Sequence, residues 1–271
     1  MRRFVMLWVP AVLVVGLGVT GCGSSSSSSS SDTTTTTTNA SKVTGNVNVS
    51  AAASLTEAFT KIGADFKRAN PGASTTFNFG SSGTLETQIQ QTSGTGVDTF
   101  ASADEDNMNK LVTAKLVDGT PTVFAKNRLV IVTKPGNPKD IKTLADLSKA
   151  GVVSLCGLTV PCGKYAAQSL QTAGVSIPET KVTRGVDVKG TLAAVTTGDA
   201  DAAIVYVTDA KRAGSSVTAV TIPDKRNVIA VYPIATLKSA ANHATSQAFI
   251  DYVMSSKGQA TLESFGFLPP S

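Results

Sequence analysis

Short apolar runs and amphipathic segments alternate along the chain from about residue 43 to its end, and this alternation limits the possible folds more than any other feature. Runs rich in β-branched residues, such as 129–133, are typical of buried strands. Segment 54–70 instead has helical spacing, with Phe59, Ile62 and Phe66 on one stripe. Strands and helices that take turns predict an α/β fold with helices on both faces of a sheet.

The same patterns predict the individual elements. The expected strands are 47–50, 74–79, 98–103, 129–133, 152–155, 202–207 and 228–237, the last of them interrupted by Pro233. The expected helices are 54–70, 84–91, 105–116, 164–173, 188–197, 246–254 and 258–265. This length of chain is enough for one full core or for two small lobes.

The first 21 residues predict export. Arg2 and Arg3 precede an apolar run at 4–19, and small residues follow it, which is the pattern of a signal peptide over 1–21. A membrane span is the alternative, because the apolar run is of marginal length for one. The pair Gly21–Cys22 resembles the cleavage box of bacterial lipoproteins. That resemblance implies cleavage before Cys22 and acylation of its thiol.

Residues 22–44 read as a tether. Eight serines, Asp32 and six threonines follow Gly23. Such a stretch has nothing to bury and cannot offset the entropy lost on ordering. It predicts a flexible link with a reach on the order of 25 Å. We therefore expect an exported protein that is lipid-anchored at the outer face of the cell membrane.

The distribution of charge and the missing motifs exclude several functions. The net charge is +5, the charges are scattered, and aromatic residues make up 6% of the chain, which does not predict a nucleic-acid surface. The sequence has no nucleophile elbow, phosphate-binding loop, dinucleotide fingerprint or metal-ligand cluster. A serine hydrolase would have to recruit His243, the only histidine. We expect neither an enzyme nor a resident metal or cofactor.

Two cysteines remain after Cys22. Cys156 and Cys162 form an even pair, and an exported protein permits a disulfide between them. Two reduced thiols and a metal pair are the alternatives. The chain has no further Cys and no nearby His that would complete a metal site.

Four expected strand-to-helix turns carry small or polar residues. In open α/β sheets, ligands bind at the carboxyl ends of strands, where the N-termini of helices offer unpaired N–H groups to an anion. Each turn alone is equally compatible with an ordinary cap. The turns are 51–56 (Ala-Ala-Ala-Ser-Leu-Thr), 79–84 (Phe-Gly-Ser-Ser-Gly-Thr), 161–165 (Pro-Cys-Gly-Lys-Tyr) and 186–190 (Val-Asp-Val-Lys-Gly).

These turns in this order, together with 98–104 (Asp-Thr-Phe-Ala-Ser-Ala-Asp), 204–210 (Ile-Val-Tyr-Val-Thr-Asp-Ala) and 242–245 (Asn-His-Ala-Thr), resemble the periplasmic molybdate-binding proteins of ABC importers. The resemblance spans residues 47–267. It implies a type II periplasmic-binding-protein fold, in which each of two lobes is a mixed sheet flanked by helices and two strands form the hinge. A strand pair at 125–133 and 228–237 suggests lobe I at 45–125 and 232–271, and lobe II at 126–231.

The resemblance also implies the ligand and its contacts. The implied ligand is molybdate or tungstate. The implied partner is the membrane permease of an ABC importer. We expect the protein to be a monomer. The implied contacts are the hydroxyls and N–H groups of Ser54 and Ser82, the backbone N–H groups of Cys162 and Val188, and the hydroxyl of Tyr206. The family more often has alanine at position 162 and serine at position 83, where this chain has Gly83.

Donors alone suit a fully ionised oxyanion. Neutral hydroxyl and amide donors can replace the hydration of a dianion without a counter-charge. A protonated oxyanion would bring an O–H group that meets no acceptor. Sulfate is excluded only by size. A site for sulfate or for a small organic anion is therefore the alternative, although the four turns lack the arginine that an organic anion would favour.

Overall fold

The sheet is built from nine strands. The computed structural model describes residues 43–271, so the predicted signal peptide, the predicted lipidation of Cys22 and the tether up to residue 42 lie outside the described residues. The strands are β1 (Gly45–Ala52), β2 (Ala73–Gly80), β3 (Thr99–Ala101), β4 (Thr122–Thr133), β5 (Val153–Cys156), β6 (Val182–Gly185), β7 (Ala202–Tyr206), β8 (Thr218–Thr221) and β9 (Ile229–Thr236).

The strands form one mixed sheet with the order β2-β1-β3-β9-β4-β7-β5-β6, and β8 pairs with β4 beside this path. β1 is parallel to β2 and β3, and β5 is parallel to β6 and β7. β4 and β9 are antiparallel to each other and join these two parallel groups. Residues 122–128 of β4 pair with β9, whereas residues 129–133 pair with β7 and β8. The long strand β4 therefore takes part in both groups of strands.

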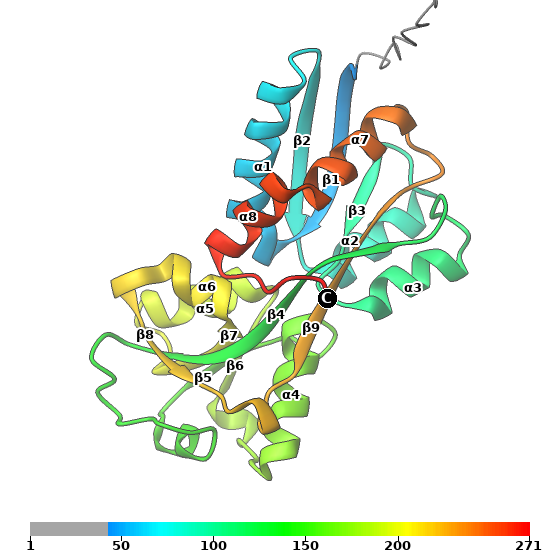
Figure 1. Cartoon of the computed structure of the whole chain (residues 1–271). Coiled ribbons are helices and arrows are strands. Elements are labelled where there is room, and N and C mark those ends of the chain that lie inside the picture. The colour runs from blue at the N-terminus through cyan, green and yellow to red at the C-terminus, as the bar shows by residue number, and fades with distance from the viewer. Residues whose placement is uncertain (1–42) are drawn as a thin grey trace, which may run out of the picture. The chain divides into compact units, whose positions relative to one another are not determined.

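The helices lie on the faces of the sheet (Figure 1). Helices α1, α7 and α8 lie on one side of β1 and β2, whereas α2 and α3 lie near β3 on the other side. Helices α4, α5 and α6 flank the second group of strands, around β5 and β7. The helices are α1 (Thr56–Ala69), α2 (Ser82–Gln91), α3 (Glu105–Thr113), α4 (Pro161–Ala173), α5 (Val188–Thr196), α6 (Val207–Ala213), α7 (His243–Met254) and α8 (Ser256–Phe265). Short 3₁₀ turns are η1 (Ala53–Leu55), η2 (Ala145–Lys149), η3 (Glu179–Lys181), η4 (Gly214–Ser216) and η5 (Asp224–Arg226).

Successive residues of β3 face opposite sides of the sheet and so belong to different apolar clusters. Ala101 lies in the larger cluster, in which Phe59 of α1 meets Phe249 of α7 edge-to-face with 5.9 Å between ring centroids. Phe100 lies in a second cluster with Leu85 of α2 and residues of α3. The period of two along a strand thus buries both faces, which confirms the predicted α/β architecture with helices on both sides.

The structure corrects several predicted elements. The helix expected from residue 54 begins only at Thr56, after the 3₁₀ turn η1. β9 continues through Pro233, which pairs with Val123 next to a register shift in β4. A shift of this kind accommodates a residue that has no N–H group to give to the ladder.

The helix α6 and two short strands, β6 and β8, were not predicted. Each of these strands is four residues long and has no run of three apolar residues, so neither gives a strong apolar signal. Both pair with strands that the sequence did predict. Within residues 43–271, no helix is both long enough and apolar enough to cross a membrane.

Candidate oxyanion site

One small cavity collects residues from the carboxyl ends of six strands. Its volume is about 10 Å³, close to the least that holds a single water molecule. The lining residues are Ala52, Ala53, Ser54, Gly80, Ser81, Ser82, Ala103, Val160, Pro161, Cys162, Asp187, Val188 and Tyr206. All five residues predicted to contact the ligand are therefore brought together here.

Ser54 lies in the 3₁₀ turn η1, directly after β1. This turn replaces the first turn of the expected helix and leaves the side chain buried at the cavity. The Ser54 hydroxyl is 2.9 Å from the hydroxyl of Tyr232, a residue of β9. The sequence pattern gave no indication of this partner, because Tyr232 is 178 residues away along the chain.

Ser82 is the first residue of α2, and Ser81 is its N-cap. The Ser81 hydroxyl accepts a hydrogen bond from the backbone N–H of Thr84, as capping serines do. The Ser82 hydroxyl oxygen instead accepts from the backbone N–H of Ala103, with 2.9 Å between the atoms. Ser81 therefore caps the helix, whereas the hydrogen of the Ser82 hydroxyl remains available to another acceptor.

Gly83 lies where the lobes approach each other. A Cβ atom at this position would come within 3.3 Å of the backbone oxygen of Thr159, in the loop before α4. A serine here would have to push that loop aside by a few tenths of an ångström. This chain thus has glycine, where the resembled family more often has serine, at a position where the two lobes approach each other closely.

Cys162 and Val188 occupy the N-terminal turns of α4 and α5. Pro161 takes the first position of α4, where its missing N–H group costs nothing. Asp187 caps α5 by accepting from the N–H of Gly190. Among the described residues, no acceptor takes the N–H of Cys162 or Val188. Both donors lie at helix N-termini, which favour negative charge.

Tyr206 is the last residue of β7 and precedes α6. Its ring is buried, and within residues 43–271 its hydroxyl has no hydrogen-bond partner. Burial raises the pKa of Tyr206 well above its usual value, so the hydroxyl keeps its proton. A buried donor without a partner is costly. Its position at the cavity indicates that a ligand supplies the acceptor.

A disulfide joins Cys156 at the end of β5 to Cys162 in α4, with 5.9 Å between their Cα atoms. This confirms the predicted bridge. The hydroxyl of Thr191 in α5, which donates to the backbone oxygen of Asp187 at 2.8 Å, lies 3.2 Å from the Cys156 sulfur. The bridge therefore joins the first turn of α4 to the end of β5 and lies against α5.

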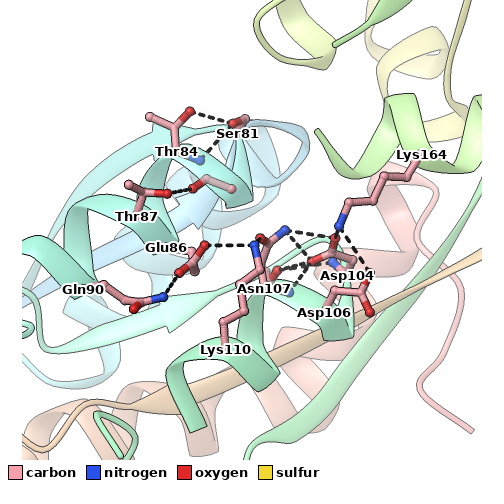
Figure 2. A network of polar contacts seen from close by, with 12 residues as sticks. Ser81, Thr84, Glu86, Thr87, Gln90, Asp104, Asp106, Asn107, Lys110 and Lys164 are labelled. Atoms are coloured by element: carbon pink, nitrogen blue, oxygen red, sulfur yellow. Dashed lines mark hydrogen bonds and ion pairs between the residues drawn. The ribbon is translucent and has the colours of Figure 1, made fainter. Parts of the chain in front are cut away.

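The cationic side chains nearest the site are used in ion pairs between the lobes. Lys164 of α4 reaches Asp104 and Asp106, at the start of α3, with N–O distances of 3.3 and 3.2 Å (Figure 2). Lys189 of α5 pairs with Glu57 of α1. Neither lysine lines the cavity. In the part of the chain that the structure describes, no three His, Cys, Asp or Glu side chains gather to hold a cation.

Known proteins resemble this chain over most of its length. Residues 47–268 match the family described as bacterial extracellular solute-binding protein. The molybdate-binding protein ModA of Mycobacterium tuberculosis is 40% identical over 226 residues, which cover 83% of this chain and 85% of that protein. YvgL of Bacillus subtilis, whose name describes a substrate-binding lipoprotein of an ABC transporter, is 30% identical over 230 residues and 83% of this chain, which cover 86% of YvgL.

Solved structures share the fold. A periplasmic molybdate-binding protein of Azotobacter vinelandii superposes with a TM-score of 0.75 at 21% identity, covering 83% of this chain and 100% of that one. The likeness confirms the expected periplasmic-binding-protein fold. The matched relatives are solute-binding proteins of transporters, not enzymes. The chain belongs to the family of bacterial extracellular solute-binding proteins.

Proposed function

We propose that this protein captures molybdate or tungstate in the cavity and delivers it to the membrane permease of an ABC importer. The observation that carries the proposal is the buried, unpartnered hydroxyl of Tyr206, which lies at the same cavity as two serine hydroxyls and two helix N-termini. The name of the mycobacterial relative, at 40% identity, supports the choice of ligand. The ligand contacts are Ser54, Ser82, Cys162, Val188 and Tyr206.

The chemistry of the cavity suits a fully ionised tetrahedral oxyanion. The proposed contacts are all donors, and the one carboxylate in the lining, Asp187, caps α5. Hydrogen phosphate would bring a hydrogen that no acceptor receives. The residues that line the cavity include no arginine, which an organic anion would favour. Molybdate and tungstate are nearly the same size, so the site should bind both.

Closure of the two lobes would enclose the anion. We assign residues 45–125 and 232–271 to lobe I, and residues 126–231 to lobe II. Lobe I then contributes Ser54 and Ser82, and lobe II contributes Cys162, Val188 and Tyr206. This division is supported by the sheet, in which only β4 and β9 continue from one group of strands to the other.

The cellular setting is part of the same proposal. A signal peptide over 1–21, acylation of Cys22 and a tether over 22–44 would place the folded part outside the cytoplasmic membrane, near the permease. β1 begins at Gly45, immediately after this tether. We expect a monomer that binds no nucleic acid.

Thermal unfolding with molybdate, tungstate, sulfate and phosphate tests the proposal. A ligand at about 100 times its Kd stabilises the folded state by roughly 2.7 kcal/mol. We expect a shift with molybdate and tungstate but not with sulfate or phosphate. A shift with sulfate alone would favour the alternative oxyanion, and no shift with any of the four anions would refute oxyanion capture.

Replacement of the unpartnered hydroxyl tests the site itself. Tyr206→Phe should weaken molybdate binding by about 1–3 kcal/mol, because one ligand oxygen loses its donor. Isothermal titration calorimetry measures the change. Tyr252→Phe is the matched control, since Tyr252 packs on Phe66 in lobe I and does not line the cavity. Equal affinities for the two variants would exclude Tyr206 as a ligand contact.

A further inference from the structure

We propose that Tyr232 and Asn127 are positioning residues that hold the Ser54 hydroxyl as a hydrogen-bond donor toward the anion. This inference rests on the proposed function. A serine hydroxyl can donate or accept, so a donor-only site needs something that fixes the direction. The hydrogen bonds of Tyr232 and Asn127 fix this direction for the Ser54 hydroxyl. Neither Tyr232 nor Asn127 lines the cavity.

The orientation of the Asn127 side chain follows from its neighbour. Its Oδ1 lies 2.9 Å from the backbone nitrogen of Arg128, and a backbone N–H group can only donate. The atom facing it must therefore be the amide oxygen. The amide nitrogen then points the other way, to the hydroxyls of Thr208 at 2.9 Å and Tyr232 at 3.4 Å.

The direction of the next bond follows in turn. The amide nitrogen of Asn127 donates to the Tyr232 hydroxyl, which leaves the hydrogen of Tyr232 for the Ser54 oxygen, 2.9 Å away. Both Asn127 and Tyr232 are fully buried. Burial raises the pKa of Tyr232, so its hydroxyl stays protonated. The Ser54 oxygen therefore accepts a hydrogen bond from Tyr232, and the Ser54 hydrogen remains available to a ligand in the cavity.

Ser82 reaches the same state by a different route. Its oxygen accepts from the backbone N–H of Ala103, which has no second orientation. The two serines come from different turns, yet each has a structural donor behind it. Because bonds in a chain polarise one another in a low-dielectric interior, each serine also becomes a stronger donor. Asn127 and Tyr232 therefore fix the Ser54 hydroxyl as a donor, as the backbone N–H of Ala103 fixes the Ser82 hydroxyl.

A double-mutant cycle distinguishes this role from a packing role. Tyr232→Phe removes only the hydroxyl and keeps the ring that meets Phe124, Tyr206 and Phe267 edge-on. We expect it to weaken molybdate binding about 3- to 10-fold. In the Ser54→Ala background, the same change should have little further effect, because its target is gone. In the Ser82→Ala background, its full effect should persist.

The measurements use the full chain and titration calorimetry with molybdate. Melting temperatures without ligand show that each variant is folded, and Tyr252→Phe serves as the control for loss of a tyrosine hydroxyl elsewhere. Unchanged binding in Tyr232→Phe, or a loss that multiplies with that of Ser54→Ala, would overturn the positioning role alone. Absence of oxyanion binding by the wild-type protein would overturn the proposed function and this inference with it.

Discussion

Asp209 is a carboxyl group in an unfavourable place. It lies in the first turn of α6, three residues after Tyr206, and is buried. Burial raises its pKa from 3.8 to about 7, against the lowering effect of Lys189. One of its oxygens has no partner among the described residues. The folded protein therefore holds a proton on this group well into the neutral range.

This proton makes stability depend on pH. Between about pH 4 and pH 7 the folded state keeps the proton that the unfolded chain releases, so the contribution of Asp209 to the unfolding free energy falls as pH rises. We expect Asp209→Asn to remove this fall, which amounts to on the order of 4 kcal/mol. Urea unfolding of both proteins from pH 4 to pH 9 measures it. Asp251→Asn, at an exposed carboxylate in α7, is the control.

At this scale, the family resemblance implied Ser54, Ser82, Cys162, Val188 and Tyr206, and the structure brings all five to one cavity. That resemblance gave no indication of Tyr232. Tyr232 lies in an apolar run, where an aromatic residue reads as core, and it packs as core on three rings. Its hydroxyl reaches Ser54 only because β9 passes beside β1's end in three dimensions, which no local pattern encodes.

The first turn of α4 is constrained in two ways. The disulfide joins it to the end of β5, and a Cβ atom at Gly163 would lie 2.0 Å from the backbone oxygen of Gly157. Only glycine fits such a contact without movement of the backbone. The disulfide and the close contact at Gly163 therefore both fix the position of the Cys162 N–H group.

Removal of the disulfide should affect both stability and binding. In Cys156→Ser/Cys162→Ser, we expect the unfolding free energy to fall by about 2 kcal/mol, as for a short closed loop. Molybdate affinity should also fall several-fold, because the Cys162 donor is no longer fixed. Denaturant unfolding and calorimetry measure the two effects. A loss of stability with unchanged affinity would mean that the bridge only staples the loop, and a reductant should not change the double variant.

The elements that the sequence did not predict correctly are those decided by their neighbours. β9 continues through Pro233 because β4 shifts register opposite it. β6 and β8 are short and half-exposed and exist as strands through pairing with β5 and β4. Long apolar strands and most helices carry their own signal, and these were predicted to within a few residues at most boundaries. The seven-residue helix α6 was missed, because it follows β7 directly and the apolar run of that strand continues into Val207.

For the whole molecule, two groups of ion pairs cross between the lobes. Glu57 of α1 meets Lys189 of α5 and Arg212 of α6, with 3.2 Å to the Arg212 Nε. A second group joins Lys164 to Asp104 and Asp106. Both groups connect residues of the two proposed lobes, so separation of those lobes would break them.

Loss of one group should speed opening. Glu57→Gln removes the acid that both basic residues share, and we expect molybdate to dissociate about 2- to 5-fold faster, consistent with a partly exposed pair. Added salt should reduce the difference from wild type by screening. Stopped-flow measurements at low and high salt test this. Asp65→Asn is the matched control on the same helix, because Asp65 pairs with Lys61 and Arg68 within α1.

The two strands that connect the lobes also carry the residues behind Ser54. Asn127 lies in β4 and Tyr232 in β9. If the proposed lobes rotate against each other, these strands must twist, and the hydrogen bonds from Asn127 through Tyr232 to Ser54 must turn with them. Under the proposed function, a permease that separates the lobes would reorient the Ser54 donor in the same movement.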